Sequence, residues 1–145
     1  MSNFATNKKA HFNYEILETF EAGVALVGAE VKSIRAKNVS LANSYIIVKD
    51  GQAWLINCHI KEFEQAKHKV PSTTRSRKLL LKKRELNKLI GKIEQKGVAL
   101  VPISLYPKKR LIKLKLGLGK AKKMHDKRET IKKREQDRNL RQTNF

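Results

Sequence analysis

The sequence feature that most constrains the fold is an Asp-Gly pair between two short runs rich in β-branched and aromatic residues. Residues 44–49 (SYIIVK) and residues 52–57 (QAWLIN) flank Asp50 and Gly51. An Asp-Gly pair in this place favours a two-residue turn, because a type I′ turn needs a positive φ at both central positions. The pattern therefore predicts an antiparallel β-hairpin.

A second hairpin is predicted over residues 98–116. Apolar residues occupy every second position of its first strand, and on the return strand they alternate with lysines. This spacing is typical of strands with one buried face and one basic, solvated face. We expect the turn at residues 106–109, where Pro107 suits the second turn position, and we expect Gly117 and Gly119 to break the pattern.

Two helices are predicted between and beside these strands. Residues 85–96 carry apolar side chains at i, i+3, i+4 and i+7, which is one face of an amphipathic helix, and Gly97 is placed for a left-handed C-terminal cap. Residues 29–37 predict a short surface helix, and residues 14–20 (YEILETF) predict a strand.

The segment before the amphipathic helix has no clean period. Residues 61–78 contain Pro71 and a Ser/Thr cluster, and they predict a long basic loop. Residues 79–81 (LLL) are either a short strand or the lead-in to the helix. This order of elements favours a mainly β protein: an antiparallel OB-type barrel with one amphipathic helix between strands, and short helices besides. A half-open sheet sandwich is the alternative.

The chain divides into three predicted parts. Residues 1–12 are expected to be a flexible segment, residues 13–119 the barrel, and residues 120–145 a basic tail with ten basic and four acidic groups. The tail has few large apolar side chains and cannot offset the roughly 1–2 kcal/mol per residue of backbone ordering entropy. We expect it to be disordered when free and helical on a polyanion.

The net charge of +20 is unevenly distributed. Residues 1–66 hold seven basic and seven acidic groups, whereas residues 67–145 hold 26 basic and six acidic groups. This asymmetry indicates a polyanionic partner. The sequence has no apolar run long enough for a membrane span and no signal-peptide layout, and its single cysteine suits a reducing cytoplasm.

Enzyme functions find little support. The adjacent Cys58 and His59 would point to opposite faces of a strand, so they do not form a nucleophile pair or a metal pair, and packing explains them better. The chain contains no CxxC, HExxH, GxSxG or phosphate-binding glycine loop. We therefore expect no catalytic residues, no metal and no cofactor.

Nucleic-acid binding has two candidate regions. In the first, Arg75, Arg77 and Lys78 stand among hydroxyl side chains, as phosphate contacts require, and Lys82 and the helix lysines extend it. The second is the tail. A solvated loop and a solubilising tail are the plainer alternatives. Composition does not separate RNA from DNA, but no groove-reading helix or intercalating wedge is evident, so an architectural DNA binder is the least favoured reading.

Several separate strings stand out along the chain: residues 18–23 (ETFEAG), 30–35 (EVKSIR), 44–45 (SY), 75–81 (RSRKLLL) and 119–128 (GKAKKMHDKR). In this order they resemble the SmpB family, the SsrA-binding proteins of bacterial trans-translation, and the resemblance runs from about residue 7 to about residue 134. The resemblance implies an OB-type barrel that is not an enzyme. It also implies binding to the tRNA-like domain of tmRNA and delivery of alanyl-tmRNA, with elongation factor Tu, to stalled ribosomes. The nascent chain is then tagged for proteolysis.

The resemblance implies roles for Asn7, Lys8, Lys9, Glu21, Leu80 and residues 125–128, and the charge pattern adds the other members of two predicted sets. The tmRNA-binding set would be Asn7, Lys8, Lys9, Glu21, Arg35, Arg75, Arg77, Lys78, Leu80 and Lys82. Glu21 could instead brace Arg35 or a lysine, and Leu80 could instead pack in the core. The tail set, for the decoding centre and the empty mRNA channel, would be Lys120, Lys122, Lys123, His125, Asp126, Lys127, Arg128, Ile131, Lys132, Lys133 and Arg134.

The sequence departs from the family at Phe12, where many relatives have His, and at Lys82, where some have Asn or His. We expect a cytoplasmic monomer with no membrane partner. The remaining alternative is a general RNA-binding or ribosome-assembly protein that uses the same basic barrel.

Overall fold

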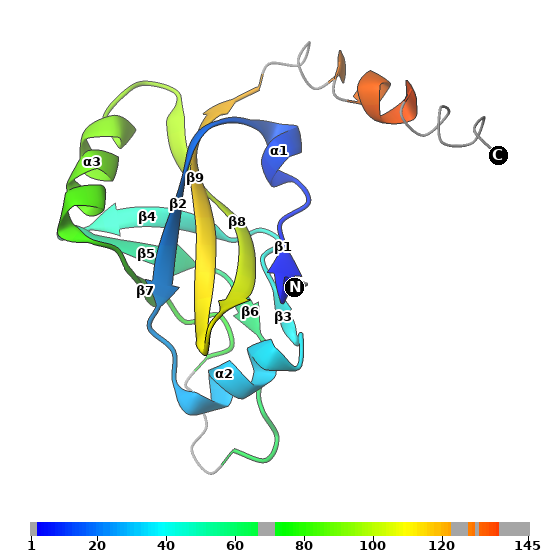
Figure 1. Cartoon of the computed structure of the whole chain (residues 1–145), viewed down its shortest axis with the longest axis vertical. Coiled ribbons are helices and arrows are strands. Elements are labelled where there is room, and N and C mark those ends of the chain that lie inside the picture. The colour runs from blue at the N-terminus through cyan, green and yellow to red at the C-terminus, as the bar shows by residue number, and fades with distance from the viewer. Residues whose placement is uncertain (1–2, 67–71, 123–127, 130, 137–145) are drawn as a thin grey trace.

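In a computed structural model of the chain, the described residues form a mainly antiparallel β structure with short helices (Figure 1). The structure describes residues 3–66, 72–122, 128–129 and 131–136. The strands are β1 (Ala5–Thr6), β2 (Tyr14–Val24), β3 (Val39–Ser40), β4 (Tyr45–Lys49), β5 (Gln52–Ile56), β6 (His59–Ile60), β7 (Arg77–Leu80), β8 (Val98–Lys108) and β9 (Leu111–Ala121). The helices are α1 (Ala10–Asn13), α2 (Gly28–Arg35) and α3 (Lys83–Ile93), and the described tail residues 128–129 and 131–136 are also helical.

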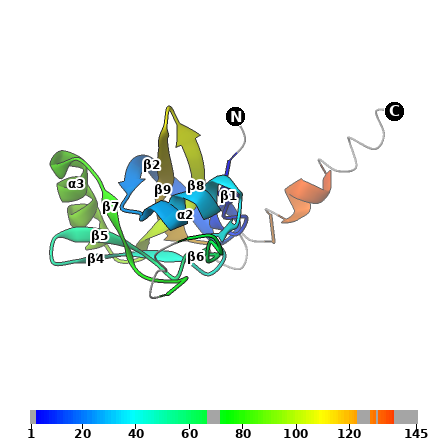
Figure 2. The ribbon, with the colours of Figure 1, turned by 90° about the horizontal axis from the view of Figure 1, so that it is seen from below.

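Seven strands form one sheet in the order β1-β8-β9-β2-β7-β5-β4, and β3 pairs separately with β6. The sheet curls so that β4, at one end of this order, also lies against β8 near the other end. Helix α3 leads from β7 into β8, and α2 lies at the end of the barrel where β8 turns into β9 (Figures 1 and 2). The predicted mainly β barrel with one amphipathic helix between strands is confirmed.

The first predicted hairpin is confirmed together with its turn. Lys49 of β4 pairs with Gln52 of β5, so Asp50 and Gly51 form the two-residue loop. Their φ angles are +53° and +71°, which are the positive values that this turn requires.

The second hairpin is confirmed, but its turn was predicted at the wrong place. Lys108 pairs with Leu111, so the loop is Lys109-Arg110 and Lys109 carries the positive φ, +56°. Pro107 lies inside β8. This is tolerated because β1 pairs only with Ser104 and Leu105 on the other side of β8, so no neighbouring strand needs an N–H from Pro107.

Gly117 and Gly119 do not end β9; they let it continue beneath α1. A Cβ at Gly117 would lie 2.9 Å from Ile16 Cγ2, and one at Gly119 would lie 3.0 Å from Tyr14 Cβ. Both glycines are buried under a small apolar cluster of Ala10, Val101 and Ile103, with Tyr14 and Ile16 against it. The main core fills the inside of the barrel.

The N-terminal segment was expected to be flexible through residue 12, whereas it carries a strand and a helical turn. The Phe4 N–H donates to the carbonyl of Leu105 at 2.8 Å, and the Asn7 N–H donates to that of Ile103 at 2.7 Å. The sequence of this segment has no strand-like pattern. It forms a strand because the edge of β8 supplies hydrogen-bond partners for its backbone groups.

The remaining boundaries shift by a few residues. Residues 79–80 belong to β7, so the short-strand alternative for residues 79–81 is correct, and the loop before β7 ends at residue 76. Helix α3 begins two residues before the predicted start and ends three residues before the predicted end. Gly97 has the predicted positive φ, +82°, in the turn that leads into β8.

Candidate nucleic-acid interface

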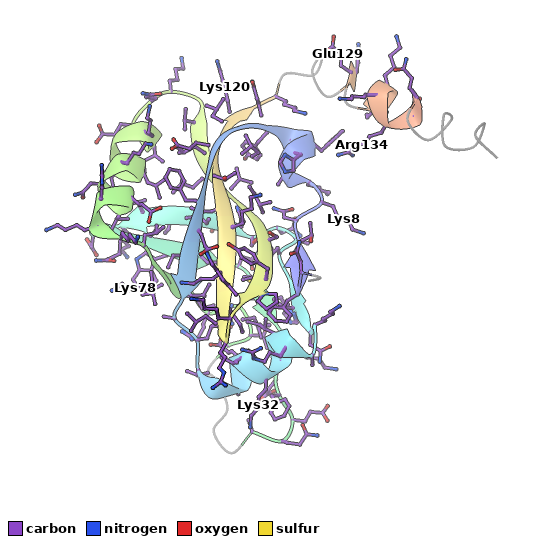
Figure 3. All side chains as sticks on the ribbon, viewed as in Figure 1. Lys8, Lys32, Lys78, Lys120, Glu129 and Arg134 are labelled. Atoms are coloured by element: carbon purple, nitrogen blue, oxygen red, sulfur yellow. The ribbon has the colours of Figure 1, made fainter. Side chains whose placement is uncertain are left out.

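The predicted RNA-binding residues lie on more than one side of the barrel. Lys8 projects beside α1 and β1, whereas Lys78 projects from β7 on the opposite side of the view (Figure 3). The sheet order explains this separation, because β8, β9 and β2 stand between β1 and β7. The structure therefore divides the predicted set into groups that are described in turn.

One group lies on the outward face of the strands β8, β9, β2 and β7, and we call it the outer patch. The register places Lys115 opposite Glu21, Lys113 opposite both Gly23 and Tyr106, and Leu80 opposite Gly23. The intervening residues of β9, Leu114 and Leu116, are fully buried on the inner face. The outer patch consists of Glu21, Lys78, Leu80, Tyr106, Lys108, Lys113 and Lys115.

Leu80 is 53% exposed on this patch. The alternative that it packs in the core is therefore wrong. Gly23 makes room for it, because a Cβ at Gly23 would lie only 3.3 Å from Leu80 Cβ. An exposed leucine beside Lys78 gives the patch an apolar contact as well as charge.

Glu21 is held at the centre of the outer patch by two donors. The Tyr106 hydroxyl donates a hydrogen bond to Glu21 Oε2, and Lys108 Nζ lies 2.9 Å from Oε1. The Tyr106 hydrogen bond, then the Lys108 hydrogen bond, hold the pKa of Glu21 below its usual range. The alternative that Glu21 braces a lysine is confirmed, whereas Arg35 donates instead to the Arg110 carbonyl at 2.8 Å.

Arg77 is fully buried, so the prediction that it contacts RNA is corrected to a structural role. Its guanidinium donates to Glu30 Oε2 through Nε at 2.9 Å and also bonds the carbonyl oxygens of Cys58 and Thr73. The sequence suggested surface cations in a loop, but β7 begins at Arg77 and turns this side chain inward.

Arg75 shares the same carboxylate. Its Nε donates to Glu30 Oε2 at 3.0 Å, and its side chain is 28% exposed. Burial alone would raise the pKa of Glu30, but hydrogen bonds from Arg75, the Val27 N–H and Arg77 outweigh burial and lower it. This network of Glu30 with Arg75 and Arg77 connects α2 to β7 and to the loop before it. Of the predicted cations Arg75, Arg77 and Lys78, Lys78 is the one on the outer patch.

A second group lines a groove of about 580 Å³ between α1, the segment 39–45 and β8. Lys8 and Lys9 are exposed at this groove. Asn7 has a structural contact there, since its Nδ2 donates to the Pro102 carbonyl at 2.9 Å. Lys82, another predicted contact, is exposed just before α3 and belongs to neither group.

The tail set is only partly described. Lys120 lies in β9, where it pairs with Glu15 and Val98, and the Lys122 N–H donates to the Asn13 carbonyl at 2.9 Å. The barrel therefore extends beyond the predicted boundary at residue 119. Arg128, Ile131, Lys132, Lys133 and Arg134 are exposed on the helical residues of the tail.

Arg134 Cζ lies 5.7 Å from the centre of the Phe12 ring in α1. The predicted positions Lys123, His125, Asp126 and Lys127 lie outside the described residues. The described part of the tail is helical, and the expected change from disorder to helix on a polyanion stays a prediction.

The acidic, histidine and cysteine side chains of the described residues were also compared with the predictions. No group of three His, Cys, Asp or Glu residues there could hold a metal ion. Burial raises the pKa of the Cys58 thiol to about 11, so it is a core side chain and a poor nucleophile. Among the same residues, no helix has the length and apolarity to cross a membrane.

Sequence reasoning missed Tyr106, Lys108, Lys113 and Lys115 as site residues. The alternation of lysines with apolar residues was visible, but it was interpreted only as the polar face of a strand. Their proximity to Glu21 depends on the pairing of β2 with β9 and of β9 with β8, which joins residues 85 and 87 positions apart.

A basic antiparallel barrel with a lysine-rich outer face and a cationic helical tail defines a nucleic-acid-binding β-barrel protein. The comparisons with known proteins give the particular family. The family model described as SmpB protein matches residues 4–144, so the chain belongs to the SmpB family.

Curated relatives agree with this assignment. The SsrA-binding protein of Gloeothece citriformis is 50% identical over 135 residues, which is 92% of this chain and 87% of that protein. The SsrA-binding protein of Nostoc punctiforme is 48% identical over 137 residues, covering 94% and 88% of the two chains. A chain from a solved structure described as "tmRNA-SmpB: a journey to the center of the bacterial ribosome" is 46% identical, with a TM-score of 0.67 over 82% of this chain and 84% of that one.

Proposed function

We propose that this protein binds the tRNA-like domain of tmRNA and delivers it to stalled ribosomes in trans-translation. The observation that carries the proposal is the 46% identity and the TM-score of 0.67 to a chain from a tmRNA-SmpB structure on the bacterial ribosome. The curated relatives at about 50% identity are named for binding SsrA. The cationic outer patch is the chemistry that such an RNA backbone needs.

In this proposal the barrel binds tmRNA and the tail binds the ribosome. Glu21, Lys78 and Leu80 serve tmRNA from the outer patch, with Arg35 beside it, while Lys82 adds a separate cation. Lys8 and Lys9 offer phosphate contacts at the groove, whereas Asn7, Arg75 and Arg77 support the fold around these contacts. The tail cations bind rRNA in the decoding centre and the empty mRNA channel, where the segment becomes helical.

The protein acts as an RNA adaptor in the cytoplasm, as a monomer and without enzymatic activity of its own. Elongation factor Tu joins it indirectly, through alanyl-tmRNA. The second candidate, a general RNA-binding or ribosome-assembly protein, rests on the same lysines, because cationic surfaces bind many structured RNAs.

A competition gel shift separates the two candidates. Labelled tRNA-like domain of tmRNA is bound by the full chain and competed with the same unlabelled RNA or with an unrelated structured RNA of equal length, at one salt concentration. We expect the unrelated RNA to compete much more weakly. Equal competition would contradict the tmRNA-specific function and favour the general one.

A further inference from the structure

The outer patch contains one acidic residue among its cations. Lys115 lies directly across from Glu21 on β9, and Lys108 and Lys113 lie on the same face. A carboxylate repels a phosphate backbone, so on charge alone Glu21 would weaken RNA binding by this surface. Its place at the centre of the patch therefore needs another reason.

The contacts of Glu21 supply that reason. One carboxylate oxygen accepts from the Tyr106 hydroxyl, and the other lies 2.9 Å from Lys108 Nζ. Tyr106 and Lys108 are alternate residues on β8, so one carboxylate from β2 reaches across β9 and fixes both. Burial, and then the hydrogen bond to Glu21, raise the pKa of Tyr106, so its hydroxyl remains a proton donor.

We propose that Glu21 is a positioning residue for RNA: its carboxylate holds the Tyr106 ring and the Lys108 ammonium on the outer patch, and these two groups contact the RNA. An aromatic ring provides a face for a base or a ribose, and an ammonium provides a charge for a phosphate. Lys113 and Lys115 supply further phosphate contacts on the adjacent strand. The proposal rests on the proposed function, because tmRNA is the RNA concerned.

Direct contact between Glu21 and RNA is the competing role. Both carboxylate oxygens already have donors, so a base or ribose hydroxyl would have to share or displace Tyr106 or Lys108. The two roles differ in what removal of the Tyr106 hydroxyl does. If Tyr106 contacts RNA, removal of its hydroxyl loosens the ring and weakens RNA binding. If Glu21 contacts RNA, removal of that hydroxyl frees the carboxylate and does not weaken RNA binding.

The test measures affinity for the tRNA-like domain of tmRNA with E21Q, Y106F and the double variant, in the full chain. E18Q is the matched control, since Glu18 lies on the same strand and also pairs with a lysine, Lys88, at 2.6 Å. E21Q and E18Q change the net charge by the same amount. Circular dichroism first confirms that each variant is folded.

We expect E21Q and Y106F each to bind about tenfold more weakly, the usual cost of losing a hydrogen bond to a charged group. E18Q should bind as tightly as the natural chain or slightly more tightly. The double variant should be no weaker than the weaker single variant, because both changes remove the same contact. If E21Q does not fold, Y106F carries the test, since it keeps the ring.

Three results would overturn the positioning role. These are unchanged binding by Y106F, additive losses in the double variant, and an equal effect of E18Q and E21Q. The natural chain's preference for the tRNA-like domain over an unrelated RNA tests the proposed function separately. The comparison among variants is made on the RNA that the natural chain binds, so failure of the positioning role and failure of the proposed function give different results.

Discussion

At the scale of single residues, Gly117 is required by the close packing of β9 against side chains of β2 and β8. An added Cβ would meet Ile16 Cγ2 at 2.9 Å, Ile103 Cδ1 at 3.1 Å and the Glu18 carbonyl oxygen at 3.4 Å. We expect G117A to lower the free energy of unfolding by about 1–3 kcal/mol, because overpacking a filled site forces its neighbours to move. Urea denaturation measures this change.

A glycine in open space is the matched control. Gly91 lies in α3, where an added Cβ meets nothing within 4 Å. G91A should therefore raise the free energy of unfolding by about 0.5–1 kcal/mol, the gain in helix propensity of alanine over glycine. Equal effects of the two substitutions would contradict the packing argument for Gly117.

Glu30 makes a pH-dependent contribution to stability. Its pKa is lowered in the folded state, so its contribution is present above the unfolded-state pKa and is lost as pH falls through the folded-state pKa. E30Q should cost about 3–5 kcal/mol near neutral pH, since it leaves the buried Arg77 charge uncompensated. The gap between E30Q and the natural chain should narrow in acid.

Urea titrations measure this difference in the free energy of unfolding at neutral pH and at pH values below the pKa of a free glutamate. E15Q, which replaces an exposed carboxylate of β2, tests the effect of net charge alone. If E30Q itself is too unstable to fold, R75M removes only the partly exposed partner and should show a smaller pH-dependent loss. A gap independent of pH would contradict the role assigned to ionised Glu30.

The sequence could predict single residues where their role is local. Gly51 and Gly97 have the positive φ angles that their positions indicated. The burial of Arg77 could not be foreseen, because its partner Glu30 is 47 positions away and on another element. The central place of Glu21 depends in the same way on strand register rather than on neighbouring residues.

At the scale of elements, both hairpins and α3 follow from periodicity, whereas β1 does not. With two residues, β1 is too short to show a periodic pattern, and the exposed edge of β8 determines where it pairs. The second turn was misplaced for the same reason. Only the pairing of β8 with its neighbours shows that Pro107 can lie inside the strand, because no neighbouring strand needs a hydrogen bond from its nitrogen. Local patterns therefore predicted the elements, and tertiary pairing set their ends.

The attachment of β1 can be tested through Asn7. Its Nδ2 donates to the Pro102 carbonyl, and its backbone N–H donates to that of Ile103. We expect N7A to lower the free energy of unfolding by about 1 kcal/mol. Amide exchange should also become faster at residues 4–7, because one of their anchors to β8 is lost. N3A, which removes an exposed bond within the segment, is the control and should leave this exchange nearly unchanged.

At the scale of the whole molecule, the fold brings residues from the neutral first part of the chain and the basic second part onto one face. The balanced first half contributes Glu21, and the basic second half contributes Lys108, Lys113 and Lys115 to the same face. The cationic helical residues of the tail lie beyond β9 (Figures 1 and 2) and meet the barrel where Arg134 lies over the Phe12 ring. Binding of tmRNA by the barrel and binding of the ribosome by the tail should therefore be separable.

The structure determines where the tail can be removed. Residues 120–121 belong to β9, and the Lys122 backbone bonds to Asn13, so a cut after residue 119 would damage the barrel. A chain ending at Lys122 keeps the whole sheet. We expect it to retain most of its affinity for the tRNA-like domain and to lose tagging of nascent chains on stalled ribosomes in a reconstituted translation reaction.

The chain ending at residue 119 is the informative comparison. It should lose stability as well as tagging, because β9 would lose the residues that pair with Glu15 and Val98. A large loss of RNA affinity in the chain ending at Lys122 would show that the tail helps to bind tmRNA. The separation of roles would then be wrong, since the exposed cations at residues 128–136 would belong to the same RNA surface as the barrel.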